Sequence, residues 1–263
     1  RYAEIDTRLS HLHDLSRRHR VPPAELKAKA DALQAELDDL ENAGATLDKL
    51  AAERRQLEKT YAGLADTLGK TRRKAADNLG SKVSELMQEL GMGGGRFEVE
   101  LEAQAGDEPD PQGRERCEFL VSANPGQPPR ALRKVASGGE LARISLAIEV
   151  AALGMDSVGT MVFDEVDTGI GGAIAEVVGQ KLRALGEHRQ VLCVTHLAQV
   201  AAQGHAHLQV SKHKEADSTS TMLTALDTRA RHDELARMLG GIDITRETRA
   251  HARKMLEQAQ QSR

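Results

Sequence analysis

Three short stretches of this sequence carry side chains that could bind or cleave a phosphate group. They are the turn Ser137-Gly138-Gly139-Glu140, the acidic pair Asp164-Glu165 and the pair Thr195-His196. Hydroxyl and backbone N–H groups bind anions, carboxylates hold Mg²⁺ or activate water, and imidazole exchanges protons near neutral pH. Together these residue types are suited to binding and hydrolysing a phosphate ester.

The Ser137-Gly138-Gly139-Glu140 turn precedes an amphipathic run, 141–152, which predicts a helix beginning at the turn. The free N–H groups and the positive dipole end of such a helix attract an anion. The glycines allow a phosphate to approach closely, and the serine hydroxyl can add a hydrogen bond. On its own, this turn more often marks an ordinary Ser-capped helix, but the two downstream stretches favour the phosphate interpretation.

Asp164-Glu165 follows an apolar run that predicts a buried strand over 159–163. Open α/β folds bind ligands at the carboxyl ends of their strands. We expect Asp164 to hold Mg²⁺ through water, because Mg²⁺ keeps much of its hydration. We expect Glu165 to orient and deprotonate the attacking water. An apolar strand ending in Asp-Glu is a weak signal alone, and the glycine-rich stretch 166–172 gives it specificity.

Thr195-His196 ends a second predicted strand, 190–194, and lies at the same sheet edge as Asp164 if the two strands are parallel. The imidazole of His196 could then donate a hydrogen bond to a γ-phosphate oxygen. A single histidine at a strand end is ordinarily structural, so this role depends on the other two stretches.

Other patterns resemble binding sites but have simpler explanations. The segment 63–71 has five residues between its glycines where a phosphate-binding loop needs four, and it continues a helical pattern. We interpret the basic cluster 72–74 as a solvated helix face. His205, His207 and His213 have no acidic or cysteine partner at metal-ligand spacing, so we interpret them as strand-face histidines.

Long helices are expected to precede the region that carries these residues. From Tyr2 to about Leu90, apolar residues recur at steps of three, four and seven, which predicts coiled-coil helices. The stretch 21–24, which contains Pro22 and Pro23, breaks and restarts the helix, and 42–44 marks a phase change. The stretch 91–95 then ends the long helix.

The remainder of the chain predicts an α/β lobe. Runs at 97–101 and 117–121 predict a β-hairpin, and alternating patterns follow from Ser137. The expected helices are 139–154, 172–185, 197–202, 229–239 and 245–260, and the expected strands are 159–163, 190–194, 206–211 and 219–226. Apolar strands with helices between them imply a buried parallel sheet. We therefore expect a coiled-coil segment over 1–92 and a lobe over 93–263.

Composition narrows the class of protein. Among 263 residues, 2% are aromatic and 29% charged, a balance typical of long helices. The net charge of -4 argues against a generally basic nucleic-acid-coating protein, so any DNA contact must be a local patch. Cys117 and Cys193 are interpreted as reduced core residues of a cytosolic protein. Neither a signal peptide nor a membrane-spanning run is recognised. The sequence starts at Arg1 within a helical pattern, so we expect an upstream part to be missing.

Several longer stretches resemble the RecN family of bacterial DNA-repair ATPases. They are 124–126, 132–143, 162–172, 194–201 and 236–241, and the resemblance covers nearly the whole chain. The related SMC proteins usually carry Leu-Ser-Gly-Gly and a different turn after Asp-Glu. Val-Ala-Ser-Gly-Gly and Thr-Gly-Ile-Gly-Gly therefore favour RecN. Gln127 departs from the glutamate expected after Asn-Pro-Gly, but it touches no catalytic role.

The resemblance implies an α/β fold that is half of an ABC-type ATPase head of the P-loop NTPase type. Both ends of the polypeptide would form the head, and an antiparallel coiled coil would join them. ATP and Mg²⁺ would bind between two heads, with the turn of one head capping the γ-phosphate held by the other. The implied roles are nucleotide binding for Ser137, Gly138, Gly139, Glu140 and Asp167, Mg²⁺ binding for Asp164, and catalysis for Glu165 and His196.

The resemblance also implies partners and a location. The partners are the amino-terminal half with its phosphate-binding loop, a second copy through the heads, and double-stranded DNA, with no membrane. The location is the cytoplasm, at the nucleoid.

Two alternatives stay open. A non-enzymatic coiled-coil scaffold or SMC-type chromosome-structuring protein would use the same elements for association only, but intact Glu165 and His196 favour an enzyme. A transporter ATPase is disfavoured because the coil precedes the Ser-Gly-Gly turn and no membrane-coupling segment is visible.

Overall fold

The structure is a computed structural model of the whole chain. It describes residues 1–104, 106, 108–135, 137–154, 158–214, 219–241 and 243–261, without the side chains of 213, 214 and 219. Two compact units are present, Arg1–Thr67 and Leu68–Arg263. Each unit is described here by itself.

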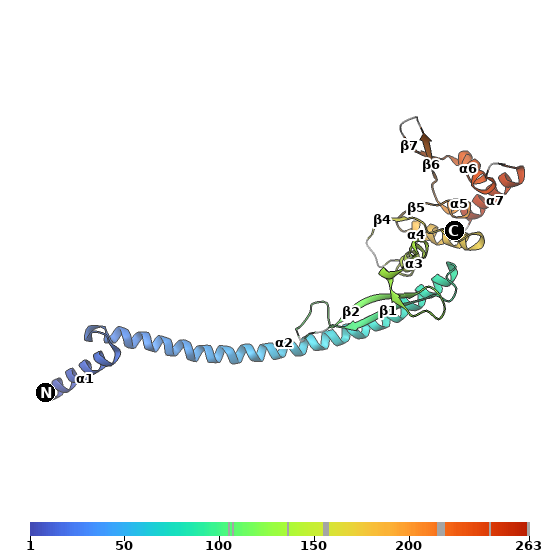
Figure 1. Cartoon of the computed structure of the whole chain (residues 1–263). Helices are drawn as coiled ribbons and strands as arrows, with labels where there is room; N and C mark the ends of the chain where they lie inside the picture. The colour runs from blue at the N-terminus through green and yellow to red at the C-terminus, as the bar shows by residue number, and fades with distance from the viewer. Residues whose placement is uncertain are drawn as a thin grey trace. The chain divides into compact units, whose positions relative to one another are not determined.

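The first unit is helical (Figure 1). Helix α1 spans Tyr2–His19, the 3-10 turn η1 spans Pro23–Glu25, and α2 spans Leu26–Glu89. Arg20 ends α1 in the left-handed region with φ 56°, which turns the chain before the prolines restart it. The predicted break at 21–24 is confirmed. At the predicted phase change, 42–44, α2 continues without a break, because a glycine costs a helix only about 1 kcal/mol.

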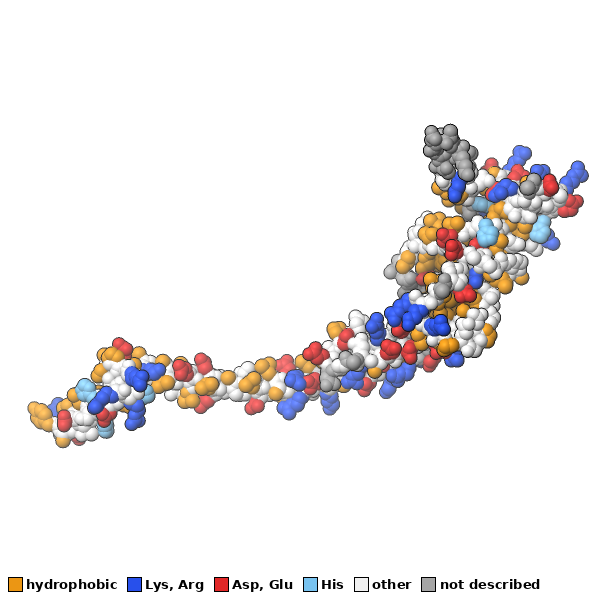
Figure 2. All heavy atoms as spheres, in the orientation of Figure 1, with side chains coloured by type: hydrophobic (Ala, Val, Ile, Leu, Met, Phe, Trp, Pro, Cys, Tyr) orange, Lys and Arg blue, Asp and Glu red, His pale blue; other side chains and the backbone are white. Residues whose placement is uncertain are grey.

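The apolar seam of the first unit is uncovered. Leu40 and Leu47 are 71% and 66% exposed, and Ile5, Leu9 and Leu57 are exposed as well. Figure 2 shows hydrophobic side chains, in orange, recurring along these helices. An apolar seam of this length is stable in water only when a second helix covers it.

The second unit begins with the end of α2 and the predicted β-hairpin. Strands β1 (Arg96–Ala103) and β2 (Glu115–Ser122) pair antiparallel, and β3 (Arg130–Ala131) adds a short third strand followed by the 3-10 turn η2 (Leu132–Lys134). Phe97 and Val121 lie opposite each other and share one core with Val83 and Met87 of α2. The apolar alternation in the sequence therefore faces α2, as its period of two requires.

Arg72 and Arg73 attach the hairpin to α2. Arg72 Nη1 donates to the carbonyl oxygen of Gln112 at 2.7 Å, and Arg73 Nη2 lies 3.3 Å from Glu115 Oε1. The interpretation of 72–74 as a solvated face is therefore wrong for Arg72, whose side chain is 25% exposed. The partners of this cluster lie far along the chain, so the local charge pattern does not reveal them.

From Ser137 onward the order of helices and strands is as predicted. The elements are α3 (Gly138–Ala151), β4 (Thr160–Phe163), α4 (Gly172–Gly186), β5 (Gln190–Cys193), α5 (Ala198–Gln203), β6 (Leu208–Lys214), β7 (Thr219–Ala225), α6 (Thr228–Gly240) and α7 (Arg246–Gln261). Strands β4 and β5 pair in parallel, whereas β6 and β7 pair antiparallel. The α/β class is confirmed, and the carboxyl ends of β4 and β5 meet at one edge.

One face of the β4–β5 sheet is packed and the other is open. Phe163 of β4 shares the main core with Leu146 of α3 and Val178 of α4. On the opposite face, Val162 and Val194 are 66% and 59% exposed. The expectation of a fully buried parallel sheet is therefore wrong for this chain, because no described helix covers the second face.

The structure also tests the rejected phosphate-binding loop and the two cysteines. The segment 63–71 lies inside α2, so its rejection as a phosphate-binding loop is confirmed. Cys117 and Cys193 are free thiols, but Cys117 is exposed on the hairpin, so its assignment to the core is wrong. Among the described residues, no three or more His, Cys, Asp and Glu side chains form a group that could hold a metal ion, and no helix could cross a membrane. The side chain of His213 lies outside the described residues.

Candidate functional site

The start of α3 has the cap that the sequence predicts. Ser137 is the N-cap residue, and its Oγ accepts a hydrogen bond from the backbone N–H of Glu140 at 3.4 Å. Ser137 and Gly138 are exposed, whereas Gly139 is buried. This arrangement can bind an anion at the positive end of the helix dipole.

The two glycines of this turn pack against the segment that follows β4. A Cβ atom added at Gly138 would overlap Glu165 Oε2. A Cβ added at Gly139 would lie 3.1 Å from the carbonyl oxygen of Thr168 and 3.3 Å from that of Glu165. The sequence predicted that these glycines admit a phosphate. The structure gives them a second purpose, which is to let α3 approach the 165–168 segment closely.

Asp164 and Glu165 are exposed where β4 ends. Glu165 has φ 58°, in the left-handed region that non-glycine residues rarely occupy. Its backbone N–H donates to Asp164 Oδ1 at 2.8 Å, which stabilises the turn. Such unfavourable backbone conformations cluster at functional sites. The exposed Asp164 carboxylate also fits the expected water-mediated hold on Mg²⁺.

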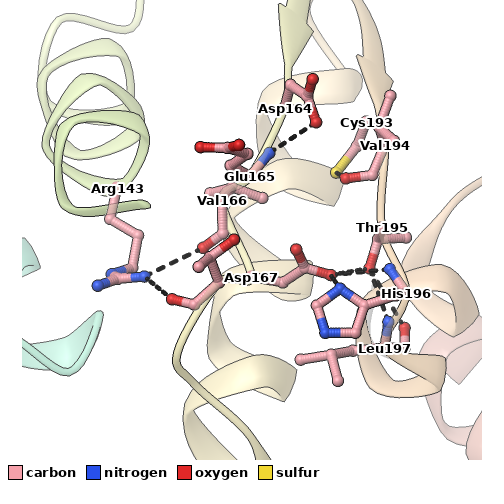
Figure 3. A network of polar contacts seen from close by, with 11 residues as sticks. Arg143, Asp164, Glu165, Val166, Asp167, Cys193, Val194, Thr195, His196 and Leu197 are labelled. Carbon is pink, nitrogen blue, oxygen red and sulfur yellow. Dashed lines mark hydrogen bonds and ion pairs between the residues drawn. The ribbon is translucent and has the colours of Figure 1, made fainter. Parts of the chain in front are cut away.

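Asp167 lies inward from this pair and contacts the end of β5 (Figure 3). Its side chain is 3% exposed. Oδ2 accepts hydrogen bonds from Thr195 Oγ1 at 2.5 Å and from the backbone N–H of His196 at 3.0 Å, and it lies 3.2 Å from His196 Nδ1. The direct binding of nucleotide by Asp167 stays a prediction, because in this structure the carboxylate serves Thr195 and His196.

A buried arginine that the sequence patterns did not single out connects α3 to the same segment. Arg143 is 7% exposed, and its Nη1 donates to the carbonyl oxygen of Thr168 at 2.8 Å. Burial lowers the pKa of Arg143, and the carboxylate of Glu140 partly opposes that effect. The available sequence signal was its position between Ala142 and Ile144, on a helix whose neighbouring residues are apolar.

The electrostatic environment at the strand ends is negative. Burial, together with the nearby carboxylates of Asp167 and Asp164, raises the pKa of Cys193 to about 12. Negative charge that stabilises a protonated thiol also favours a bound cation. The site therefore combines an anion-binding helix start, a negative region suited to Mg²⁺, an exposed carboxylate and an exposed imidazole.

The predicted residues thus come from three elements that meet at one edge. Glu165 reaches the α3 turn at Gly138, and Asp167 joins the β4 end to His196. Figure 3 shows Glu165, Asp167 and His196 between the helix that carries Arg143 and the carboxyl ends of β4 and β5. Hydrolysis of a phosphate ester requires a positioned anion, a metal ion and an activated water, and this edge offers residues for each.

The chain is similar to curated proteins over nearly its whole length. It is 51% identical over 98% of its residues to the DNA repair protein RecN of Xylella fastidiosa strain Temecula1. Identity is 43% over 97% for the protein of that name from Vibrio cholerae and 32% over 98% for that from Bacillus subtilis. The chain spans about half the length of these relatives, 46%, 46% and 47%.

Two further comparisons add little. No protein-family model matches the chain. The solved SMC head domain with a coiled coil and joint from Pyrococcus yayanosii covers 92% of this chain and 44% of its own length at 17% identity. Its TM-score of 0.44 is too low to carry weight.

Proposed function

The chain is a homologue of the proteins named DNA repair protein RecN, and on this premise we propose that it is the carboxy-terminal half of an SMC-like, ABC-type ATPase head. Residues 1–92 are the returning arm of a coiled coil, and 93–263 are the carboxy-terminal lobe of the head. A match to about half of each relative, 46% for the Xylella protein, is consistent with this division.

One observation carries the proposal. The Asp164-Glu165 pair and His196 lie at one edge, connected through Asp167. An exposed carboxylate and an exposed imidazole that meet beside an acidic residue suited to Mg²⁺ favour the enzyme over the non-enzymatic scaffold, which needs none of them.

In the proposed reaction, ATP with Mg²⁺ lies between two heads. Asp164 would hold the ion through water, Glu165 would orient and deprotonate the attacking water, and His196 would lie near the γ-phosphate. The Ser137-Gly138-Gly139-Glu140 turn of the second head caps that phosphate with its backbone N–H groups. Mg²⁺ supplies charge neutralisation on the phosphate oxygens, and the protein groups supply orientation.

The uncovered apolar surfaces support a missing partner half. Val162 and Val194 on the open face of the β4–β5 sheet are exposed, as are Leu208 and Leu223 on the β6–β7 hairpin. Monomeric proteins rarely leave apolar surface of this kind in water. The amino-terminal half, with its phosphate-binding loop, covers the sheet, and its outgoing helix covers the seam of α1 and α2.

The biological role proposed for the whole protein is repair and recombination of DNA double-strand breaks, in the cytoplasm at the nucleoid. The name of the relatives, DNA repair protein RecN, supports a role in DNA repair. Double-stranded DNA and a second copy of the head are the proposed partners. Binding ATP would engage two heads, and hydrolysis would release them.

The test is ATP hydrolysis by this chain alone and after mixing with a polypeptide that carries the amino-terminal half, with and without linear double-stranded DNA. Hydrolysis only in the mixture, stimulated by DNA, is expected. Absence of hydrolysis from a mixture that forms a stable complex would reject the enzyme and leave the scaffold.

A further inference from the structure

The contact between Asp167 and His196 bears on which ring nitrogen of His196 carries a hydrogen. Asp167 Oδ2 lies 3.2 Å from His196 Nδ1. A carboxylate offers only acceptors, and a ring nitrogen that turned its lone pair toward the carboxylate would be repelled, so the contact favours a hydrogen on Nδ1. In a neutral imidazole the other nitrogen, Nε2, is then left with a lone pair and no hydrogen.

Asp167 cannot easily turn away from this contact. Its side chain is 3% exposed, and the same oxygen accepts from Thr195 Oγ1 and from the backbone N–H of His196. Arg143 Nη1 donates a hydrogen bond to the carbonyl oxygen of the next residue, Thr168. Turning the Asp167 carboxylate away would leave the part-buried Thr195 hydroxyl and the backbone N–H of His196 without their acceptor.

The side chain of His196 is exposed, whereas that of Asp167 is buried. At 71% exposure the His196 ring is accessible to a ligand, while Nδ1 is occupied by Asp167. Figure 3 shows the ring beside Asp167, with its second nitrogen directed away from the carboxylate. The nitrogen available to a ligand is therefore Nε2.

We infer that Asp167 is a positioning residue that holds neutral His196 as the Nδ1–H tautomer and so makes Nε2 a hydrogen-bond acceptor. The ligand of Nε2 must then bring its own hydrogen. The identity of that ligand rests on the proposed function. It is the water beside the γ-phosphate and not a bare phosphate oxygen. The donation from His196 to phosphate that the sequence suggested is unavailable to this tautomer.

The tautomer can be measured without any enzymatic activity. The chain is labelled with ¹⁵N-histidine, and long-range proton–nitrogen correlations are recorded near pH 8.5, about two units above the ordinary imidazole pKa of about 6.5. The His196 signals are those absent from His196→Gln. A protonated Nδ1 and an unprotonated Nε2 are expected.

Three variants identify the cause. Asp167→Ala should shift the ring to the Nε2–H form, whereas Asp167→Asn should keep the Nδ1–H form because its amide oxygen can still accept. Thr195→Val removes a different donor to Asp167 and should leave the tautomer unchanged. The remaining histidine signals report whether each variant keeps its fold.

An Nε2–H or doubly protonated ring in the unmodified chain would overturn the inference, even if Asp167→Ala fails to fold. An unchanged tautomer in folded Asp167→Ala would also overturn it. These outcomes do not depend on ATP hydrolysis.

The reconstituted head supplies the kinetic readout. Loss of an orienting residue should lower kcat by about 10- to 100-fold with KM little changed in Asp167→Ala, and Asp167→Asn should recover part of that loss. A rise in KM with unchanged kcat would overturn the assignment of water as the ligand. If the unmodified mixture hydrolyses no ATP, the proposed function fails while the tautomer result stands.

Discussion

Arg143 of α3 donates from Nη1 to the carbonyl oxygen of Thr168 at 2.8 Å, so the helix that starts at Ser137 is bonded to the segment carrying Glu165 and Asp167. A movement of α3 therefore moves this segment, and the reverse also holds. The contact lies inside one chain and needs no ligand.

Arg143→Met should remove this connection while keeping most of the buried volume. The carbonyl of Thr168 would lose its donor, at a cost of about 1–3 kcal/mol in the free energy of unfolding. Urea unfolding measures the loss, and faster amide exchange over 165–168 should accompany it. The exposed Arg229→Met, on α6, is the matched control and should change stability by no more than about 0.5 kcal/mol. Equal effects of the two variants would show that the Arg143 contact contributes nothing specific.

The two glycines of the α3 turn should respond differently to alanine. At Gly139 the added methyl group meets backbone atoms of Glu165 and Thr168, which cannot move cheaply. At Gly138 it meets only the end of the flexible Glu165 side chain. Gly139→Ala should therefore be the less stable of the two variants, by about 1–3 kcal/mol, the range for overpacking. Thermal or urea unfolding of the pair measures the difference, and equal stability would contradict the close approach.

The two cysteines should differ in reactivity. Burial raises the pKa of Cys193 to about 12, so almost none of it is thiolate at pH 8, whereas Cys117 is exposed. A thiol reagent such as Ellman's should modify Cys117 quickly and Cys193 only after unfolding. The variants Cys117→Ser and Cys193→Ser assign the two rates. Rapid modification of Cys193 in the folded chain would contradict the packed underside of β5.

Protonation of Glu234 should lower the free energy of unfolding at acid pH. Hydrogen bonds from Arg237, at 2.7 and 2.8 Å, hold the pKa of Glu234 below its ordinary value, against the opposing effect of burial. Because the folded-state pKa is lowered, this contribution is complete above the ordinary glutamate pKa of about 4.3 and is lost as pH falls through the folded value.

The stability difference between the unmodified chain and Glu234→Gln should therefore shrink below about pH 4.3. Denaturant unfolding across the acid range measures it. Glu176→Gln, on the exposed face of α4, is the control and should show no such trend. A difference that stays constant down to the acid limit would contradict the ion pair.

The order of elements from Ser137 onward could be predicted because helix and strand periodicities are local properties of sequence. The ends of β4 and β5 could be predicted for the same reason, which placed Glu165 and His196 correctly at one edge. The contacts of Arg72 with Gln112 and of Arg143 with Thr168 could not be predicted, since they join residues that only the folded chain brings together. The open face of the β4–β5 sheet was missed because an apolar strand has the same sequence pattern whether its cover is present or absent.

The central claim is that the turn at Ser137 of one head completes the site of Glu165 in another. Complete heads carrying Ser137→Arg and complete heads carrying Glu165→Gln should each hydrolyse ATP at least 100-fold more slowly than unmodified heads, roughly the low end for loss of a general base. The exposed Glu176→Gln serves as the unaffected reference.

The most direct measurement is ATP hydrolysis by an equal mixture of the two inactive heads. Half of the randomly formed dimers contain one head of each kind, and each of these has one intact site of two, so recovery to about a quarter of the unmodified rate is predicted. No recovery in a mixture that forms dimers would contradict the claim and place Ser137 and Glu165 of the same chain in one site.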